Sequence, residues 1–186
     1  MVVLWVKIVV FLLATAALIY MSRAALVVPR SHGFYRFFAW ETILILVLLN
    51  VGTWFREPFS WPQLISWSLL AISLFLVIHG VHLLRKLGRP DARRQDASLV
   101  AFEKTTSLVE EGAYRYIRHP LYSSLLFFTW GVFFKDPSWA GSLLAAAATL
   151  FLVATAKVEE REDVCFFGAA YQEYMKHTKM FIPFLF

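Results

Sequence analysis

Five apolar runs constrain this sequence more than any other feature. They occupy residues 2–21, 37–55, 64–84, 121–134 and 139–156. A helix of about twenty apolar residues crosses the hydrocarbon core of a bilayer, and a chain with 59% hydrophobic residues and a mean hydropathy of +0.61 is more apolar than an ordinary soluble domain. The pattern predicts an all-α, polytopic membrane protein with five transmembrane helices. The fourth run is short, so either it does not fully span or its first turn lies in the interface.

Lysine and arginine are distributed unevenly between these runs. On one side of five spans, residues 22–36 carry three, residues 85–118 carry eight and the tail carries four, against Lys7, Arg56 and Lys135 on the other side. Because basic residues favour the cytoplasmic side of a membrane, the N-terminus is predicted outside and the C-terminus in the cytoplasm. Insertion alone explains this bias, so the net charge of +5 requires no nucleic-acid partner. A cleaved signal peptide is the competing interpretation of the first run, but no basic stretch precedes it.

We therefore expect a single membrane domain over residues 1–186. Its parts are three spanning helices (1–84), a cytoplasmic connection (85–120), a helical hairpin (121–156) and a cytoplasmic tail (157–186). With five spans, the connection and the tail meet on one face of the membrane.

The connection ends in a polar stretch at residues 112–124, Gly-Ala-Tyr-Arg-Tyr-Ile-Arg-His-Pro-Leu-Tyr-Ser-Ser. Proline disfavours a helical conformation in the residue before it but fits the first turn of a helix, so a helix is predicted to begin at Pro120. The N-terminus of such a helix attracts carboxylate or phosphate. Interfacial anchoring is the alternative interpretation of Arg118 and the nearby tyrosines. The histidine fixed before the proline, His119, favours a ligand site.

The tail carries a second group of polar and aromatic residues. Glu159 and Glu160 are adjacent, so on a helix they point about 100° apart and only one is expected to face a ligand fully. Tyr171 and Tyr174 are three residues apart and share a helical face, where they can form an aromatic wall around a flat ring. Phe167 precedes them by one turn and is equally compatible with simple packing.

These two segments together resemble the isoprenylcysteine carboxyl methyltransferase and phospholipid methyltransferase family of integral membrane enzymes. The resemblance rests on the Arg-His-Pro-x-Tyr motif at residues 118–122, on the glutamate pair one hydrophobic hairpin later, and on the Phe-Gly-x-x-Tyr-x-x-Tyr pattern at 167–174. It covers roughly residues 82–184, while the first two spans match only as generic apolar helices. The two-part pattern is specific, whereas Arg-His-Pro alone is weak.

The resemblance implies S-adenosylmethionine as the methyl donor, bound at the cytoplasmic side. The residues that we expect to bind this cofactor are Tyr114, Arg118, His119, Pro120, Tyr122, Glu159, Glu160, Phe167, Tyr171 and Tyr174. The candidate catalytic residues are Arg118, Glu159 and Glu160. Arginine and histidine suit the carboxylate of the donor, a glutamate suits its ammonium or ribose hydroxyls, and aromatic rings suit adenine and the sulfonium.

The acceptor stays open at this point. A carboxylate acceptor needs a cation nearby, which Arg118, Arg115 or Lys157 can supply, whereas an amine acceptor must lose a proton, which a glutamate can take. A thiol is a third possibility. The eukaryotic isoprenylcysteine enzymes have an arginine one turn before the glutamate pair, where this chain has Thr155, which argues against a prenylcysteine carboxylate as the substrate. The chain is also shorter than those enzymes and looks like a prokaryotic member, which implies the inner membrane. We expect a lipophilic or lipid substrate.

Two other classes compete with this interpretation. His79 and His82 in the third span can be combined with Glu41 as metal ligands, but five histidines are too few for a membrane di-iron cluster, and we expect no metal. A non-catalytic membrane component or transporter subunit with a degenerate site is the alternative function. Glu41 and Asn50 inside the second span favour it, although hydrogen bonds between packed helices explain them equally well.

Overall fold

The computed structural model describes residues 2–89 and 105–186, and these residues fold almost entirely into helices. The α-helices are α1 (Val2–Leu26), α2 (His32–Asn50), α3 (Trp61–Leu87), α4 (Pro120–Phe133), α5 (Trp139–Phe167) and α6 (Ala169–His177). Two short 3-10 helices, η1 (Val51–Thr53) and η2 (Gly112–Arg115), complete the regular structure of the described part. The all-α prediction is therefore confirmed.

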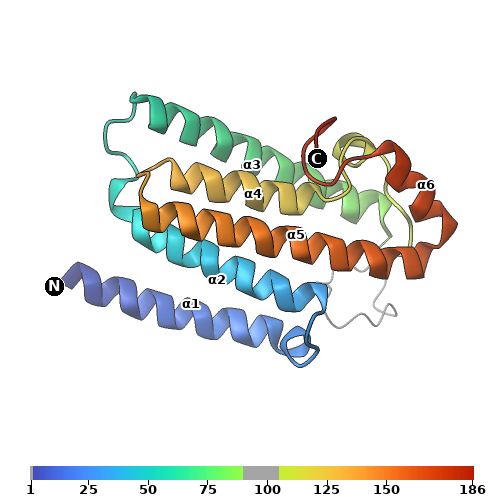
Figure 1. Cartoon of the computed structure of the whole chain (residues 1–186), viewed down its shortest axis with the longest axis horizontal. Coiled ribbons are helices and arrows are strands. Elements are labelled where there is room, and N and C mark those ends of the chain that lie inside the picture. The colour runs from blue at the N-terminus through green and yellow to red at the C-terminus, as the bar shows by residue number, and fades with distance from the viewer. Residues whose placement is uncertain (1, 90–104) are drawn as a thin grey trace.

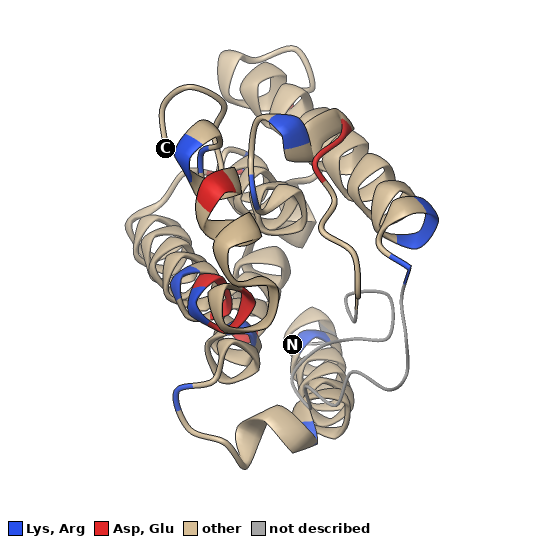
Figure 2. Ribbon diagram, turned by 90° about the vertical axis from the view of Figure 1, so that its right-hand side faces the viewer, with Lys and Arg blue, Asp and Glu red and all other residues tan. Residues whose placement is uncertain are grey.

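Helices α1 to α5 lie side by side, with chain neighbours running in opposite directions (Figure 1). Helix α4 packs against α3, α5 and α2, whereas α1 packs against α2. The α1–α2 turn, the end of α3, η2 and the C-terminal tail all lie at the same end of the bundle. Figure 2 views the molecule from this end and shows charged positions on the helix ends and segments that face the viewer.

Four helices are long and apolar enough to cross a membrane, counting only described residues: Val3–Leu26, His32–Thr53, Trp61–Leu87 and Trp139–Phe167. The fourth predicted span, α4, is an apolar helix of 14 residues, below the length that a bilayer requires. The structure thus supports four candidate spans with a short helix packed among them. The five-span count is not established.

Local sequence signals explain where these helices begin and end. Helix α4 begins at Pro120, as predicted, with His119 in a non-helical conformation before it. Helix α5 begins after Ser138, whose Oγ accepts a hydrogen bond from Gly141 N at 3.1 Å. It ends at Gly168, whose φ of 62° few other residues adopt readily. Helix α5 therefore continues through residues 157–167, beyond the apolar run, and carries both glutamates.

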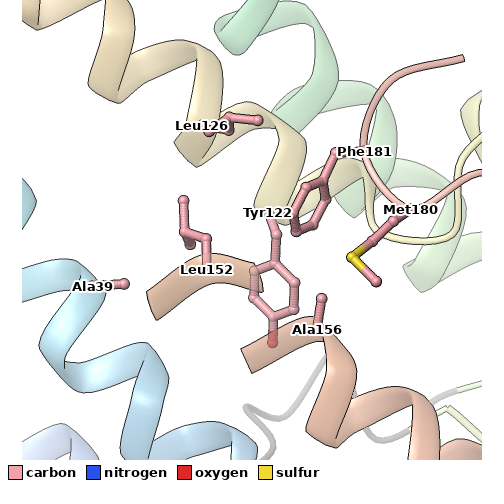
Figure 3. Close-up of a cluster of buried hydrophobic side chains, with 7 residues drawn as sticks. All are labelled: Ala39, Tyr122, Leu126, Leu152, Ala156, Met180 and Phe181. Carbon is pink, nitrogen blue, oxygen red and sulfur yellow. The ribbon is translucent and has the colours of Figure 1, made fainter. Parts of the chain in front are cut away.

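One hydrophobic cluster is formed by residues of α2, α4, α5 and the C-terminal tail (Figure 3). Tyr122 from α4 and Ala156 from α5 lie beside Met180 and Phe181 from the tail. Phe181 is fully buried. The C-terminal segment is thus an integral part of the helical core.

Polar residues inside the helices bond neighbouring helices and turns. Asn50 donates its side-chain amide to the carbonyl of Val132 at 2.9 Å, and Thr15 donates to Glu41 at 2.9 Å. These bonds agree with the helix-packing interpretation of the two polar residues in the second span. At the far end of the bundle, buried Lys135 donates to Gln63 at 2.9 Å.

Candidate functional site

Backbone hydrogen bonds join the polar segment at 112–124 to the part of the tail that follows α6, residues 178–186. Arg118 N donates to Lys179 O at 2.8 Å, Lys179 N donates to Tyr116 O at 3.0 Å, and His119 N donates to Met180 O at 3.2 Å. Ile117 and Lys179 form an isolated parallel bridge. Two segments that lie about sixty residues apart in sequence therefore form one unit.

Side chains strengthen this junction. Arg118 donates from Nε to Glu160 Oε1 at 2.5 Å and from Nη1 to the Thr178 carbonyl at 2.5 Å, with both ionised side chains only 10% exposed. The hydroxyl of Tyr174 donates to the Tyr114 carbonyl at 2.6 Å. Arg118 thus ties together the polar segment, helix α5 and the tail.

A pocket with ≈ 650 Å³ of empty space, its open mouth included, lies where these elements meet. Nine of the ten residues predicted for the donor site line it: Tyr114, Arg118, His119, Pro120, Tyr122, Glu159, Phe167, Tyr171 and Tyr174. The tenth, Glu160, lies behind the wall in its pair with Arg118.

The two glutamates have different environments. Glu159 lines the pocket, and in the described part of the chain its buried Oε2 makes no hydrogen bond. Glu160 points toward Arg118, with its Oε1 also 3.4 Å from Nε2 of His119. That nitrogen is buried and likewise makes no hydrogen bond to a described residue. Buried polar groups without partners are rare, so Glu159 and His119 offer hydrogen-bonding atoms to a ligand.

Aromatic rings form a second wall. The Phe167 and Tyr171 rings are nearly parallel, with centroids 6.3 Å apart, and Tyr171 meets Tyr174 edge-on at 5.7 Å. The His119 ring, which also lines the pocket, is stacked on Tyr122 at 5.5 Å. Burial raises the pKa of the Tyr171 and Tyr174 hydroxyls above the ordinary tyrosine value, so both stay neutral at physiological pH.

Sequence reasoning missed part of the lining. Asp163 follows Glu159 by four residues, so its place on the same face of α5 was detectable once that helix is extended to Phe167. The apolar side of the pocket has no local sequence signal. It consists of Leu84, Leu108, Val109 and Leu121, together with the polar Thr105.

His79 of the third span contacts the polar segment. Nε2 of His79 accepts a hydrogen bond from Ala113 N at 3.3 Å, and its ring stacks on Phe75. Within the described residues, no three His, Cys, Asp or Glu side chains are grouped as a metal site. His79 instead fixes the start of the polar segment to α3.

Comparisons with known proteins find relatives that are methyltransferases. The chain is 31% identical over 157 residues to methanethiol S-methyltransferase 2 of Bradyrhizobium diazoefficiens, covering 77% of this chain and 57% of the relative. It is 33% identical over 135 residues to protein-S-isoprenylcysteine O-methyltransferase of Rattus norvegicus, covering 69% and 46%, and 30% identical over 146 residues to protein-S-isoprenylcysteine O-methyltransferase B of Arabidopsis thaliana, covering 76% and 73%. The chain spans about half the length of the first two relatives.

A family model described as phospholipid methyltransferase matches residues 61–170, which include α3, α4, α5 and the polar segment. This match covers more than half of the 186 residues. The chain belongs to the phospholipid methyltransferase family.

Proposed function

We propose that this protein transfers a methyl group from S-adenosylmethionine to a lipophilic acceptor in the pocket between α4, α5 and the tail. The observation that carries the proposal is the meeting of the polar segment with the glutamate-bearing helix around one cavity. Family membership supports methyl transfer as the reaction class. The alternative, a non-catalytic component or transporter subunit, has no comparable support.

The residues of the pocket fit the chemical groups of the donor. The unpartnered Oε2 of Glu159 suits an ammonium or ribose hydroxyl, and Nε2 of His119 suits a carboxylate or hydroxyl. The rings of Phe167 and Tyr171 suit the flat adenine and the cationic sulfonium. When bound, the donor supplies an activated methyl group with an excellent leaving group. The protein then needs only to align the two reactants and exclude water.

The candidate catalytic residues take different roles in this proposal. Glu159 is the group that contacts a ligand, and it can accept a proton from an amine or thiol acceptor. Arg118 and Glu160 hold the site together, because Nε and Nη1 of Arg118 are engaged by Glu160 and the Thr178 carbonyl.

We further propose that the site faces the cytoplasm, with the N-terminus outside, in a prokaryotic inner membrane. The charge count supports this orientation, because the basic segments join the helices at one end of the bundle. The apolar residues Leu84 and Leu121 on the pocket wall suit the hydrophobic part of an acceptor.

A methyl-transfer assay tests the function and sorts the acceptors. Purified protein in vesicles is incubated with methyl-labelled S-adenosylmethionine and, in separate arms, with an alkyl thiol, a prenylcysteine carboxylate or phosphatidylethanolamine. We expect labelled product in at least one arm, lost in Glu159→Gln and retained in Glu173→Gln, an exposed glutamate of α6. No product in any arm, together with no binding of S-adenosylhomocysteine, contradicts the proposal.

A further inference from the structure

The first turn of α2 brings an unexpected histidine to the polar end of α5. His32 is the first residue of α2 and is completely buried. Its Nδ1 forms an ion pair with Glu162 Oε2 of α5, whose side chain is 38% exposed. Helix α2 lies outside residues 61–170, the part of the chain that the family model matches. Neither the pocket lining nor the sequence motifs include this pair.

This pair adjoins the carboxylate of the pocket. Glu162 follows Glu159 by three residues, so the two side chains are neighbours on one face of α5. Arg36, four residues after His32 and only 6% exposed, is on the neighbouring turn of α2. His32 is thus held next to the face of α5 that carries Glu159, and His119, the residue before α4, lines the same pocket as Glu159.

Burial disfavours the ionised form of a carboxylate, and nearby positive groups favour it. Arg36 is charged at every accessible pH, whereas histidine gains or loses its charge near neutrality. The charge of His32 therefore decides how much positive potential α2 supplies to Glu159. Glu162 favours the cationic form of His32, because it is the direct ion-pair partner.

We propose that His32 is a positioning residue for the methyl-donor site, acting in its cationic form and together with Glu162 to keep Glu159 ionised for ligand binding. This inference rests on the proposed function, because it assumes that Glu159 contacts the donor. Helix α2 then contributes a positioning residue to the donor site. It also makes donor affinity dependent on pH through His32.

The test measures the affinity of S-adenosylhomocysteine by calorimetric titration between about pH 6 and pH 8.5. The proteins compared are the wild type, His32→Gln, Glu162→Gln and the control Glu173→Gln. The control removes the exposed partner of His177 on α6, which is a second His–Glu pair away from the pocket. Thermal unfolding in the same detergent identifies the variants that fold.

We expect wild-type affinity to fall as the pH rises through the titration of His32. In Glu162→Gln the fall begins at lower pH, so that binding is about tenfold weaker near pH 7.5 yet equal to wild type near pH 6. In His32→Gln binding is weak throughout, with a flatter profile, and the control matches the wild type. A purely structural role predicts instead an equal loss at all pH values in Glu162→Gln.

Two results overturn the inference while leaving the proposed function intact. One is a wild-type affinity and pH profile in folded His32→Gln. The other is a pH-independent loss in Glu162→Gln. Absence of binding by the wild-type protein overturns the proposed function itself, and the inference with it.

Discussion

The ion pair between Arg118 and Glu160 should control whether the tail stays attached to the pocket. Both side chains are 10% exposed, so water screens them little. Replacing Arg118 with Met keeps an apolar stem but leaves the carboxylate without its main partner. Breaking a buried pair from one side costs about 3–5 kcal/mol. We expect the lower end, about 3 kcal/mol, because His119 Nε2 also lies 3.4 Å from the same carboxylate oxygen.

Hydrogen exchange at the tail measures this cost locally. The amides of Lys179 and His119 are hydrogen-bonded across the junction, to Tyr116 and Met180, so they exchange when the tail opens. A loss of about 3 kcal/mol raises the exchange rate of these amides by about a hundredfold in Arg118→Met.

The double variant decides the physical cause. Removing both charges in Arg118→Met with Glu160→Leu should bring the rate back to within about tenfold of the wild type, because no unpaired carboxylate remains. The exposed neighbour change Arg115→Met serves as control and should have no effect. Strictly additive effects of the two single changes, or wild-type exchange in Arg118→Met, would refute the reasoning.

Three further predictions concern packing and the aromatic wall. Gly131→Val should lower the free energy of unfolding by about 1–3 kcal/mol, because even a Cβ at this position lies 2.9 Å from a side chain of α3. The control is Gly52→Ala, whose Cβ meets no atom within 4 Å. Denaturant unfolding in detergent compares the two variants. Tyr174→Phe leaves the Tyr114 carbonyl without its donor, and tail exchange should rise by an amount equivalent to about 1 kcal/mol; an unchanged rate contradicts the assignment of this bond. Because burial raises the pKa of Tyr171, folding favours its neutral form, and stability should fall as the pH rises above about 10; thermal unfolding should show a smaller fall in Tyr171→Phe.

Local signals in the sequence predicted the features that depend on local chemistry. The start of a helix at Pro120 follows from the ring of proline itself. The shared face of Tyr171 and Tyr174 follows from their spacing of three residues in α6. Within each segment the predicted pocket residues lie together for the same reason, whereas a common pocket also requires the two segments to meet.

Features that depend on distant contacts had no such signal. The fifth apolar run ends at residue 156, yet α5 continues to Phe167, because no residue before Gly168 interrupts the helix. The backbone pairing of Ile117 with Lys179 joins remote segments, and no local pattern indicates it. Adjacency predicted that only one of Glu159 and Glu160 faces the site, but the structure was needed to show that Glu159 lines the pocket and Glu160 pairs with Arg118.

The contact of His32 in α2 with Glu162 in α5 was missed for a different reason. Its N-terminal residues precede the apolar run at 37–55 and read as a basic interfacial segment. Only the packing of α2 against α5 brings His32 to Glu162. A polar contact of this kind becomes detectable when the helix pairing is known.

The most direct test of the central claim is a calorimetric titration of S-adenosylhomocysteine into the purified protein near pH 7, with Glu159→Gln and the control Glu173→Gln in parallel. The claim is that the pocket lined by Glu159 and Tyr171 holds the methyl donor. We predict saturable binding at one site per chain, at least about tenfold weaker in Glu159→Gln and unchanged in the control. No binding at millimolar ligand, or equal binding by wild type and folded Glu159→Gln, would contradict it.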